Sequence, residues 1–301
     1  MSITPRFSVV IPTRGDAPHL RRALASALEQ GPDIEVIIAH PAAVPLPGEL
    51  LFDHRVVAVT TASTTPGGTR NAALALARAP YVAFLDDDDL WAPGHLAAAG
   101  SALDGDPSLD AYTCDAWLFT DTTPDGSAKP PADLATLPRF LGPGAPLSPS
   151  PGELLVKNVV LTPAVVARLA ALRAVGGFDG DMAAMEDWDL WIRFAGHGRL
   201  HIEREPRIVV RRRPASASRN LRAMAECGLA VAHRALESGI AIDARDRRAL
   251  FARLEHDLAY ACLKGGDARA ARNAAGRAIA LAPFRFKTYL YWLAAVIGLA
   301  P

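Results

Sequence analysis

Residues 81–91 read YVAFLDDDDLW, an uninterrupted apolar run that ends directly in four aspartates. A short apolar run with β-branched and aromatic residues predicts a strand buried on both faces of a sheet. The same kind of run occurs at residues 7–11 (FSVVI), 34–39 (IEVIIA) and 55–60 (RVVAVT). Helix-forming stretches at residues 19–30 and 69–78 lie between these runs. The alternation predicts an α/β fold with a mainly parallel sheet flanked by helices.

Polar residues follow three of the predicted strands at their carboxyl ends. Thr13 comes after the first strand, His40 after the second, and Asp86 begins the acidic run after the fourth. Ligands of parallel α/β sheets bind at the carboxyl ends of the strands. We therefore expect the chemistry of this protein at that edge of the sheet.

The composition is that of an ordinary globular protein without a charge bias. Among 301 residues, 32 are Lys or Arg and 32 are Asp or Glu. This balance disfavours a nucleic-acid-binding protein, because such proteins need excess cations to displace counterions from phosphates. Three widely spaced cysteines predict neither a disulfide framework nor a zinc site. The chain has no apolar run long enough to cross a membrane and does not start like a signal peptide, so we expect a cytoplasmic protein.

The four adjacent aspartates at residues 86–89 admit two interpretations. The first is a solvated acidic turn before the next helix, where the helix dipole favours carboxylates. The second is a metal site, because a cation would relieve the repulsion within the run and carboxylate oxygens suit Mg²⁺ or Mn²⁺. In extended backbone Asp86 and Asp88 point the same way, so they could share the cation and a diphosphate, while Asp87 and Asp89 face elsewhere.

Three segments, in this order, carry a family resemblance: residues 7–13 (FSVVIPT), 67–91 (GGTRNAALALARAPYVAFLDDDDLW) and 176–193 (GGFDGDMAAMEDWDLWIR). With them, residues 5–218 resemble the family 2 glycosyltransferases, which have the Rossmann-like GT-A fold. The resemblance implies a nucleotide-sugar donor, a transfer that inverts the anomeric configuration, and Mn²⁺ or Mg²⁺ at the Asp-x-Asp motif.

The resemblance also implies roles for single residues. Thr13 is expected near the nucleobase or ribose, and Arg70 near the nucleotide or its phosphates. Asp86 and Asp87 are expected to bind the nucleotide sugar, and Asp86 and Asp88 to bind the metal. From periodicity alone, Arg70 is an exposed residue near the start of a helix.

A second acidic cluster, Glu186 and Asp187 with Asp189 two residues later, begins a predicted helix at residues 186–195. By itself it is typical of an acid-rich helix N-terminus, with Asp189 and Arg193 paired across one turn. In the family that the chain resembles, this motif supplies the catalytic base, and the matching residue is Asp187. An inverting displacement needs a base because the acceptor hydroxyl loses its proton as it attacks the anomeric carbon. A metal at the departing diphosphate makes a separate general acid unnecessary.

Two positions depart from the family pattern. Many relatives have an Asp pair after the second strand, where this chain has Ala39 and His40, and nucleobase recognition therefore stays open. Relatives often carry a His before the proline of residues 211–218 (RRRPASAS), and Arg213 stands there. Arg213 could contact the diphosphate with two nitrogens, or it could belong to a solvated strand end. For His40 two interpretations remain: it contacts the nucleobase, or it is a plain surface residue.

The predicted organisation is a GT-A domain at residues 1–218 followed by a helical extension at residues 219–301. Eight of the 24 prolines fall within residues 121–152, which predicts a long loop near the acceptor cleft. Residues 257–283 predict a helical hairpin that packs onto the main domain.

Residues 289–299 (YLYWLAAVIGL) predict an apolar helix too short to span a bilayer. Because apolar residues occupy nearly every position, the helix needs a cover. The candidates are the main domain, a second subunit in a homodimer, and the inner face of the cytoplasmic membrane. In the last case Arg285 and Lys287 would lie near lipid phosphates.

The sequence as a whole predicts an inverting, metal-dependent glycosyltransferase that acts on a glycan or lipid-linked saccharide in polysaccharide or cell-envelope assembly. The alternative is a noncatalytic protein that keeps the fold, binds a nucleotide sugar or glycan, and uses its helical tail to bind a partner. The two altered positions favour this alternative, and the complete acidic motifs oppose it. A plain dinucleotide-binding domain is disfavoured because no GxGxxG motif follows the first strand.

Overall fold

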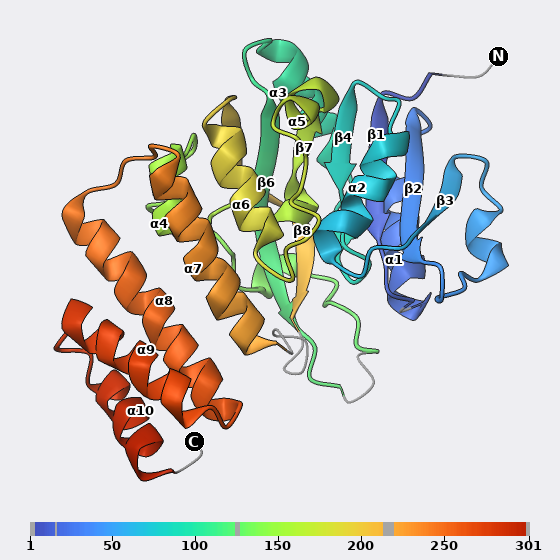
Figure 1. The fold of residues 1–301 in the computed structure, drawn as a ribbon. Coiled ribbons are helices and arrows are strands. Elements are labelled where there is room, and N and C mark those ends of the chain that lie inside the picture. The colour runs from blue at the N-terminus through green and yellow to red at the C-terminus, as the bar shows by residue number, and fades with distance from the viewer. Residues whose placement is uncertain (1–3, 16, 124–126, 213–219, 299–301) are drawn as a thin grey trace.

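The computed structural model describes residues 4–15, 17–123, 127–212 and 220–298 (Figure 1). Within these residues, eight strands form one sheet in the order β3-β2-β1-β4-β7-β6-β8-β5. The strands are β1 (Phe7–Pro12), β2 (Ile34–Pro41), β3 (Val56–Thr61), β4 (Tyr81–Phe84), β5 (Leu90–Trp91), β6 (Ala111–Thr120), β7 (Val166–Arg168) and β8 (Leu200–Arg212). The helices are α1 (Ala17–Leu28), α2 (Pro66–Leu76), α3 (His95–Gly105), α4 (Pro151–Val156), α5 (Leu169–Ala174), α6 (Glu186–Ala195), α7 (Leu221–Glu237), α8 (Ala244–Lys264), α9 (Ala268–Leu281) and α10 (Phe286–Ile297). Short 3-10 helices are η1 (Gly48–Leu51), η2 (Leu134–Thr136) and η3 (Thr162–Ala164).

The sheet is mixed but mainly parallel, as predicted. β1 lies between β2 and β4 and is parallel to both, with Val9 opposite Val36 on one side and Ala83 on the other. β3 extends this group in parallel beside β2, and β6 and β8 form a second parallel pair. β7 joins the two groups because it pairs antiparallel with both β4 and β6. β5 pairs antiparallel with β8 at the edge of the sheet.

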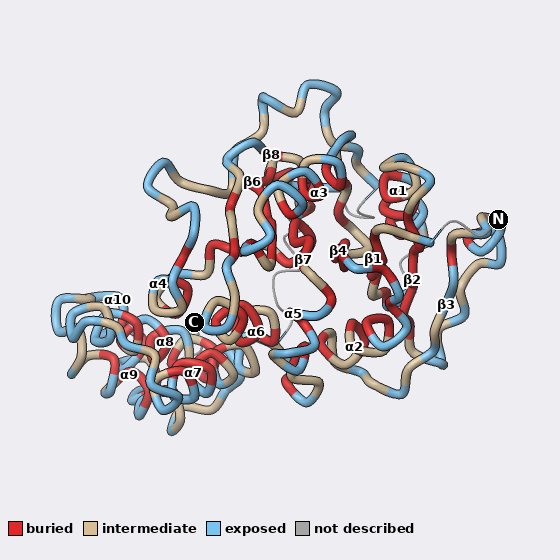
Figure 2. Tube along the Cα trace, turned by 90° about the horizontal axis from the view of Figure 1, so that it is seen from above, coloured by how far each residue is buried: buried red, intermediate tan, exposed pale blue. Residues whose placement is uncertain are grey.

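Two hydrophobic cores lie on opposite faces of the sheet. Val10 and Ile37 pack with residues of α2 and α6, whereas Val9 and Ile38 pack with residues of α1 and α3. Successive side chains of a strand point to opposite faces, so a strand between two cores is apolar at nearly every position. This explains the continuous apolar runs of β1, β2 and β4. Figure 2 shows the buried residues gathered along the strands and inside the group of C-terminal helices.

The acidic run at residues 86–89 is a turn and not an extended segment. The backbone N–H of Asp89 donates to the carbonyl oxygen of Asp86 (3.1 Å), which closes the turn. The expectation that strand alternation points Asp86 and Asp88 the same way is therefore wrong. Aspartate favours turns because its side chain accepts local hydrogen bonds. The turn connects β4 to β5, and β5 pairs with β8. The acidic run therefore lies between the end of β4 and the end of β8.

The C-terminal helices include the predicted hairpin, formed by α8 and α9 around Gly265 and Gly266. Gly266 has a φ of 77°, a left-handed conformation that glycine adopts without strain. α7 and α8 share the core on the α6 face of the sheet, where Val231 and Leu254 belong to the same cluster as Trp188. The extension is thus packed onto the main fold through α6. No helix in the described ranges is long and apolar enough to cross a membrane.

Candidate functional site

Thr13 and the acidic turn meet at the carboxyl ends of β1 and β4. The hydroxyl of Thr13, which is buried, donates to Oδ2 of Asp87 at 2.5 Å. The same hydroxyl accepts the backbone N–H of Gly15 at 3.0 Å. Because β1 and β4 are parallel neighbours, the residues that follow them emerge at the same edge. Two predicted donor-binding residues are therefore in direct contact.

Arg70 links the acidic turn to the second acidic cluster. It lies in α2, which begins after the N-cap residue Thr65. One nitrogen of its guanidinium group donates to Oδ1 of Asp86 and another to Oε1 of Glu186, both at 2.7 Å. Its guanidinium carbon lies 5.4 Å from the centroid of the Phe178 ring. Periodicity predicts an exposed residue here, and this is wrong: Arg70 is buried.

The charge of Arg70 survives burial because of its two partners. Burial alone opposes the charged form, but the charges of Asp86 and Glu186 outweigh that effect and raise the pKa of Arg70. An arginine between two carboxylates holds them at a fixed separation, since the planar guanidinium offers donors in set directions. The two acidic motifs therefore form one network, although they are far apart in the sequence.

Arg211 holds the other end of the acidic turn, and sequence reasoning missed it. Its backbone N–H donates to Oδ1 of the buried Asp89 at 2.8 Å, and its Nε donates to the carbonyl oxygen of Asp88 at 3.3 Å. Its Nη1 donates to Oδ2 of Asp121 at 2.5 Å. Burial and the charges of Asp88 and Asp86 raise the pKa of Asp89 well above its usual range. The turn thus brings four carboxyl groups together, one of them buried, between Arg70 and Arg211.

The register of β6 and β8 places Arg211 beside Asp121. Arg211 begins the basic stretch of residues 211–213, which is typical of a solvated strand end, yet its side chain is buried. β6 and β8 are parallel and pair up to Thr120 opposite Arg212. Asp121 directly follows β6, and its carboxylate pairs with Arg211, one residue before the end of β8. The pairing depends on this register, which the fold sets.

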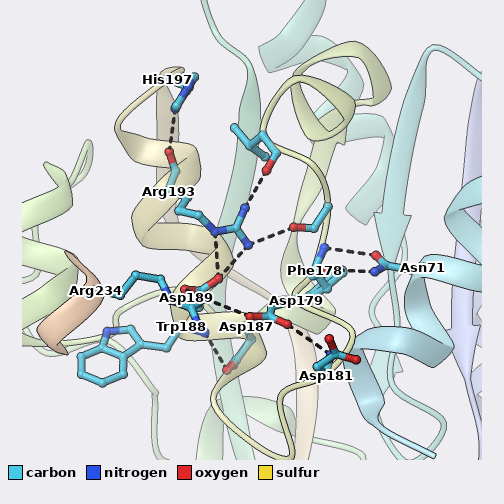
Figure 3. A network of polar contacts seen from close by, with 12 residues as sticks. Asn71, Phe178, Asp179, Asp181, Asp187, Trp188, Asp189, Arg193, His197 and Arg234 are labelled. Atoms are coloured by element: carbon cyan, nitrogen blue, oxygen red, sulfur yellow. Dashed lines mark hydrogen bonds and ion pairs between the residues drawn. The ribbon is translucent and has the colours of Figure 1, made fainter. Parts of the chain in front are cut away.

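Asp187 lies in the first turn of α6, directly after Glu186 (Figure 3). One of its carboxylate oxygens accepts the backbone N–H of Trp188 at 2.7 Å. Desolvation and the charge of Glu186 raise the pKa of Asp187 from 3.8 to about 6. The residue before the motif, Met185, has a φ of 62°, a left-handed conformation that is strained for a residue with a side chain. Asp187 is therefore a carboxylate poised to bind a proton close to neutral pH.

Ion pairs and backbone contacts fix the position of α6 (Figure 3). Asp189 pairs with Arg193 one turn later at 2.8 Å, as predicted, and also with Arg234 of α7 at 3.1 Å. Arg234 contacts Asp179 as well, at 2.9 Å. Asn71 exchanges two hydrogen bonds with the backbone of Phe178, which ties the loop before α6 to α2. The start of α6 is consequently braced from α2, from its own loop and from α7.

The two departures from the family pattern have different outcomes. His40 is buried, and its Nδ1 lies 2.7 Å from the carbonyl oxygen of Val44, so a plain surface position is wrong for it. Arg213 lies outside the described residues.

The acidic turn contains the carboxylates for which a divalent cation is predicted. Among the residues that the structure describes, no three His, Cys, Asp or Glu side chains are grouped as a complete ligand set. Asp86 and Asp88 nevertheless offer carboxylate oxygens, the donors that Mg²⁺ and Mn²⁺ prefer. Beside them, burial and then the charges of Asp88 and Asp86 raise the pKa of Asp89. Two carboxylates are fewer than a complete ligand set, so a cation held by Asp86 and Asp88 would need further ligands from outside the protein.

Comparisons with known proteins find similar sequences for the first part of the chain. Residues 8–116 match the family model Glycosyl transferase family 2. The chain is 38% identical over 108 residues to the succinoglycan biosynthesis protein ExoW of Rhizobium meliloti (strain 1021), an alignment that covers 33% of this chain and 34% of that protein. The match thus spans about a third of the length of this curated relative.

Solved structures share the fold over nearly the whole chain. S. aureus TarS 1–349 in complex with UDP-GlcNAc superposes with a TM-score of 0.62 at 17% identity, covering 97% of this chain and 88% of that one. The mannosyltransferase PcManGT from Pyrobaculum calidifontis, in complex with GDP-Man and Mn²⁺, gives a TM-score of 0.55 at 21% identity, covering 98% and 86%. The matched segment holds Thr13, Arg70 and the acidic turn, and the sheet around them is the GT-A fold. Residues 8–116 therefore resemble the family 2 glycosyltransferases in sequence, and the fold of nearly the whole chain agrees with that resemblance.

Proposed function

We propose that the chain transfers a sugar from a nucleotide-sugar donor to a hydroxyl group of a glycan or lipid-linked saccharide, with inversion and with Mn²⁺ or Mg²⁺. The observation that carries the proposal is the position of Arg70, which pairs with Asp86 at one end and Glu186 at the other. The turn expected to bind the donor and the motif expected to supply the base are thereby held in one buried network.

The donor end of the site consists of Thr13, Asp87 and the rest of the acidic turn. Asp86 and Asp88 would hold the cation, and Arg213 would contact the diphosphate. When bound, the cation stabilises the negative charge that grows on the departing diphosphate. The four adjacent carboxyl groups of the turn support this assignment, because a bound cation would reduce the repulsion among those that are ionised.

The acceptor end centres on Asp187. As the acceptor oxygen forms its bond to the anomeric carbon, the bond from that carbon to the diphosphate oxygen breaks, and the hydroxyl proton passes to a carboxylate oxygen of Asp187. A pKa of about 6 leaves most Asp187 ionised at neutral pH and makes it a stronger base than an ordinary aspartate. The brace around the start of α6 keeps this carboxylate in place while the acceptor binds.

The relatives suggest the context of the reaction. ExoW is a succinoglycan biosynthesis protein, and the solved structures that share the fold contain UDP-GlcNAc or GDP-Man with Mn²⁺. By analogy we place this chain in polysaccharide or cell-envelope assembly in the cytoplasm, with one of these classes of donor.

Donor hydrolysis tests the proposal without knowledge of the acceptor, because water can replace the acceptor hydroxyl. A panel of UDP-, GDP- and dTDP-sugars is first screened by thermal shift with and without Mn²⁺, since a ligand of the native state raises its melting temperature. The stabilising donor is then followed by proton NMR. We expect slow release of free sugar, first seen in the anomeric form opposite to that of the donor. Release with retained configuration would contradict an inverting transfer, and binding of a donor without any turnover would favour a noncatalytic binding protein.

A further inference from the structure

α10 leaves one apolar side uncovered. Thr288, Tyr291 and Ala295 are buried, and α10 packs through this side against α8 and α9. On the rest of its surface, large apolar residues are exposed to solvent. With Phe284 directly before the helix, these are Phe284, Phe286, Tyr289, Leu290, Trp292, Leu293, Val296 and Ile297. We call this set the α10 face.

The exposure of the α10 face is too large for an ordinary surface. The side chains of Phe284 and Phe286 belong to residues that are 85% and 77% exposed. A contiguous apolar surface on a soluble fold marks a site that something else covers. Packing within the chain covers only the α8 and α9 side, so the cover must come from outside the described fold.

The charge near the α10 face distinguishes between a second copy of the chain and an anionic surface as its binding partner. From residue 268 to the end, the sequence contains five Arg or Lys and neither Asp nor Glu, although the whole chain is neutral. One of the five, Arg277, pairs with Glu255 of α8, and the charge argument rests on the others. Lys287 is exposed in the first turn of α10, with its ammonium nitrogen 5.9 Å from the centroid of the Tyr291 ring, and Arg272 is exposed on α9. A second copy of the chain would bring the same cations against these. An anionic surface would instead complement them.

We propose that the α10 face docks on the surface of an anionic lipid bilayer. A helix of 12 residues is about 18 Å long, too short to cross the bilayer but suited to lie in its interface. Leu290, Leu293 and Ile297 enter the region below the head groups, and Trp292 and Tyr289 lie at their level, where aromatic residues with a polar tip are most stable. Lys287 remains beside the lipid phosphates. Figure 1 shows α10 at the outer end of the C-terminal helices, away from the sheet, where a bilayer could reach it.

Vesicle flotation with the full chain tests this proposal independently of transferase activity. The protein is mixed with vesicles of phosphatidylcholine alone or with 30% phosphatidylglycerol, at low and at high salt. We expect flotation with the anionic vesicles that weakens as salt rises, because apolar contact and charge act together. Phe286→Ser should lower the vesicle affinity about tenfold, the scale expected from removing one large apolar side chain from the membrane.

Phe52→Ser is the matched control, because Phe52 is 85% exposed and lies by η1, away from α10. It should float like the unmodified chain, and Leu293→Ser should behave like Phe286→Ser. Three results would overturn the proposal: no flotation with anionic vesicles at low salt, equal losses for Phe52→Ser and Phe286→Ser, or a dimer by analytical ultracentrifugation that dissociates on Phe286→Ser while neither form floats. Circular dichroism melts of each variant confirm that the comparison is between folded proteins.

Discussion

At the scale of the residue, Asp187 and Glu186 are chemically alike and have different surroundings. Glu186 gives its carboxylate to Arg70, which compensates its charge. Asp187 accepts a backbone N–H from Trp188, and the neighbouring charge of Glu186 acts against its ionisation. In the proposed function, Glu186 is therefore the structural anion and Asp187 the proton acceptor. The difference between the two carboxylates comes from their surroundings and not from the type of residue.

Asp187→Asn should bind the donor almost as tightly as the unmodified chain and lower the turnover by about two to four orders of magnitude, the usual contribution of a general base. Asn keeps an oxygen that can accept the Trp188 N–H, so the backbone of α6 should be unchanged. Donor affinity from calorimetry and turnover from sugar release check the two parts separately. The control is Asp181→Asn, an exposed acid in the loop before α6. A tenfold or larger loss of donor affinity would make Asp187 a binding residue instead.

The pH dependence follows from the raised pKa of Asp187. The ionised form is the base, so kcat/KM should rise about tenfold per pH unit below about 6 and level off above it. Stability has the opposite sign: a carboxyl group whose pKa rises on folding stabilises the fold below about pH 4, and this contribution is lost as the pH rises through about 6. Asp187→Asn cannot ionise, so the variant does not lose this stability as the pH rises. In denaturant titrations, the variant should therefore have a larger free energy of unfolding than the unmodified chain at pH 7 but not at pH 4. A pH-rate profile that is flat from pH 5 to 7 would contradict the assignment of Asp187 as the base.

At the scale of the element, the site depends on how closely α2 approaches the start of α6. Gly67 in the first turn of α2 permits this contact. A Cβ atom on Gly67 would lie 2.8 Å from the carbonyl oxygen of Asp179 and 3.2 Å from both Cγ of Glu186 and Cβ of Phe178. The backbone oxygen cannot yield without moving the loop before α6. The glycine therefore sets the distance across which Arg70 reaches Glu186.

Gly67→Ala should lower the free energy of unfolding by about 1–3 kcal/mol, the range for a side chain forced into a packed contact. Gly276→Ala is the matched control, because Gly276 lies in α9 with no neighbouring atom within 4 Å of an added Cβ. There the better helix propensity of alanine should raise stability by about 0.5–1 kcal/mol. Urea denaturation measures both. Equal shifts in the same direction would mean that the α2–α6 contact is not tight.

The elements themselves were predictable to different degrees. β1, β2 and β4 lie between two cores, so their sequences alone predict them. β6 does not stand out as a run because Thr113 and Asp115 are buried polar residues within it, and the first half of β8 carries charges on its exposed side. α6 begins at the predicted residue because its acidic first turn is a local signal.

At the scale of the whole molecule, the site could be predicted as two motifs but not as one network. Thr13, Asp87 and Asp187 each stand beside a local signal, the end of a strand or the start of a helix. The pairing of Arg70 with Glu186 joins residues 116 positions apart, and the Arg211 contact with Asp121 joins residues 90 apart. No local pattern encodes such pairs, because they depend on how the sheet brings its carboxyl ends together.

The C-terminal extension shows the same limit. Its helices follow from their composition, but Trp188 of α6 packs in one cluster with Val231 and Leu254, which only the fold reveals. The proposed boundary near residue 218 therefore divides the chain by topology, while the hydrophobic core continues across it. Changes in α7 can reach the site through α6, since Arg234 pairs with Asp189 two residues after Asp187.

The central proposal is that the acidic turn binds a nucleotide-sugar diphosphate together with a divalent cation. Calorimetric titration of the stabilising donor with Mn²⁺ and with EDTA, for the full chain and for Asp88→Asn, tests it most directly. The exposed Glu237 supplies the control variant Glu237→Gln. We expect binding that requires Mn²⁺, is retained in Glu237→Gln, and falls more than about tenfold in a folded Asp88→Asn, because a cation ligand is lost. Equal affinity in EDTA, or an unchanged affinity in Asp88→Asn, would contradict the proposal.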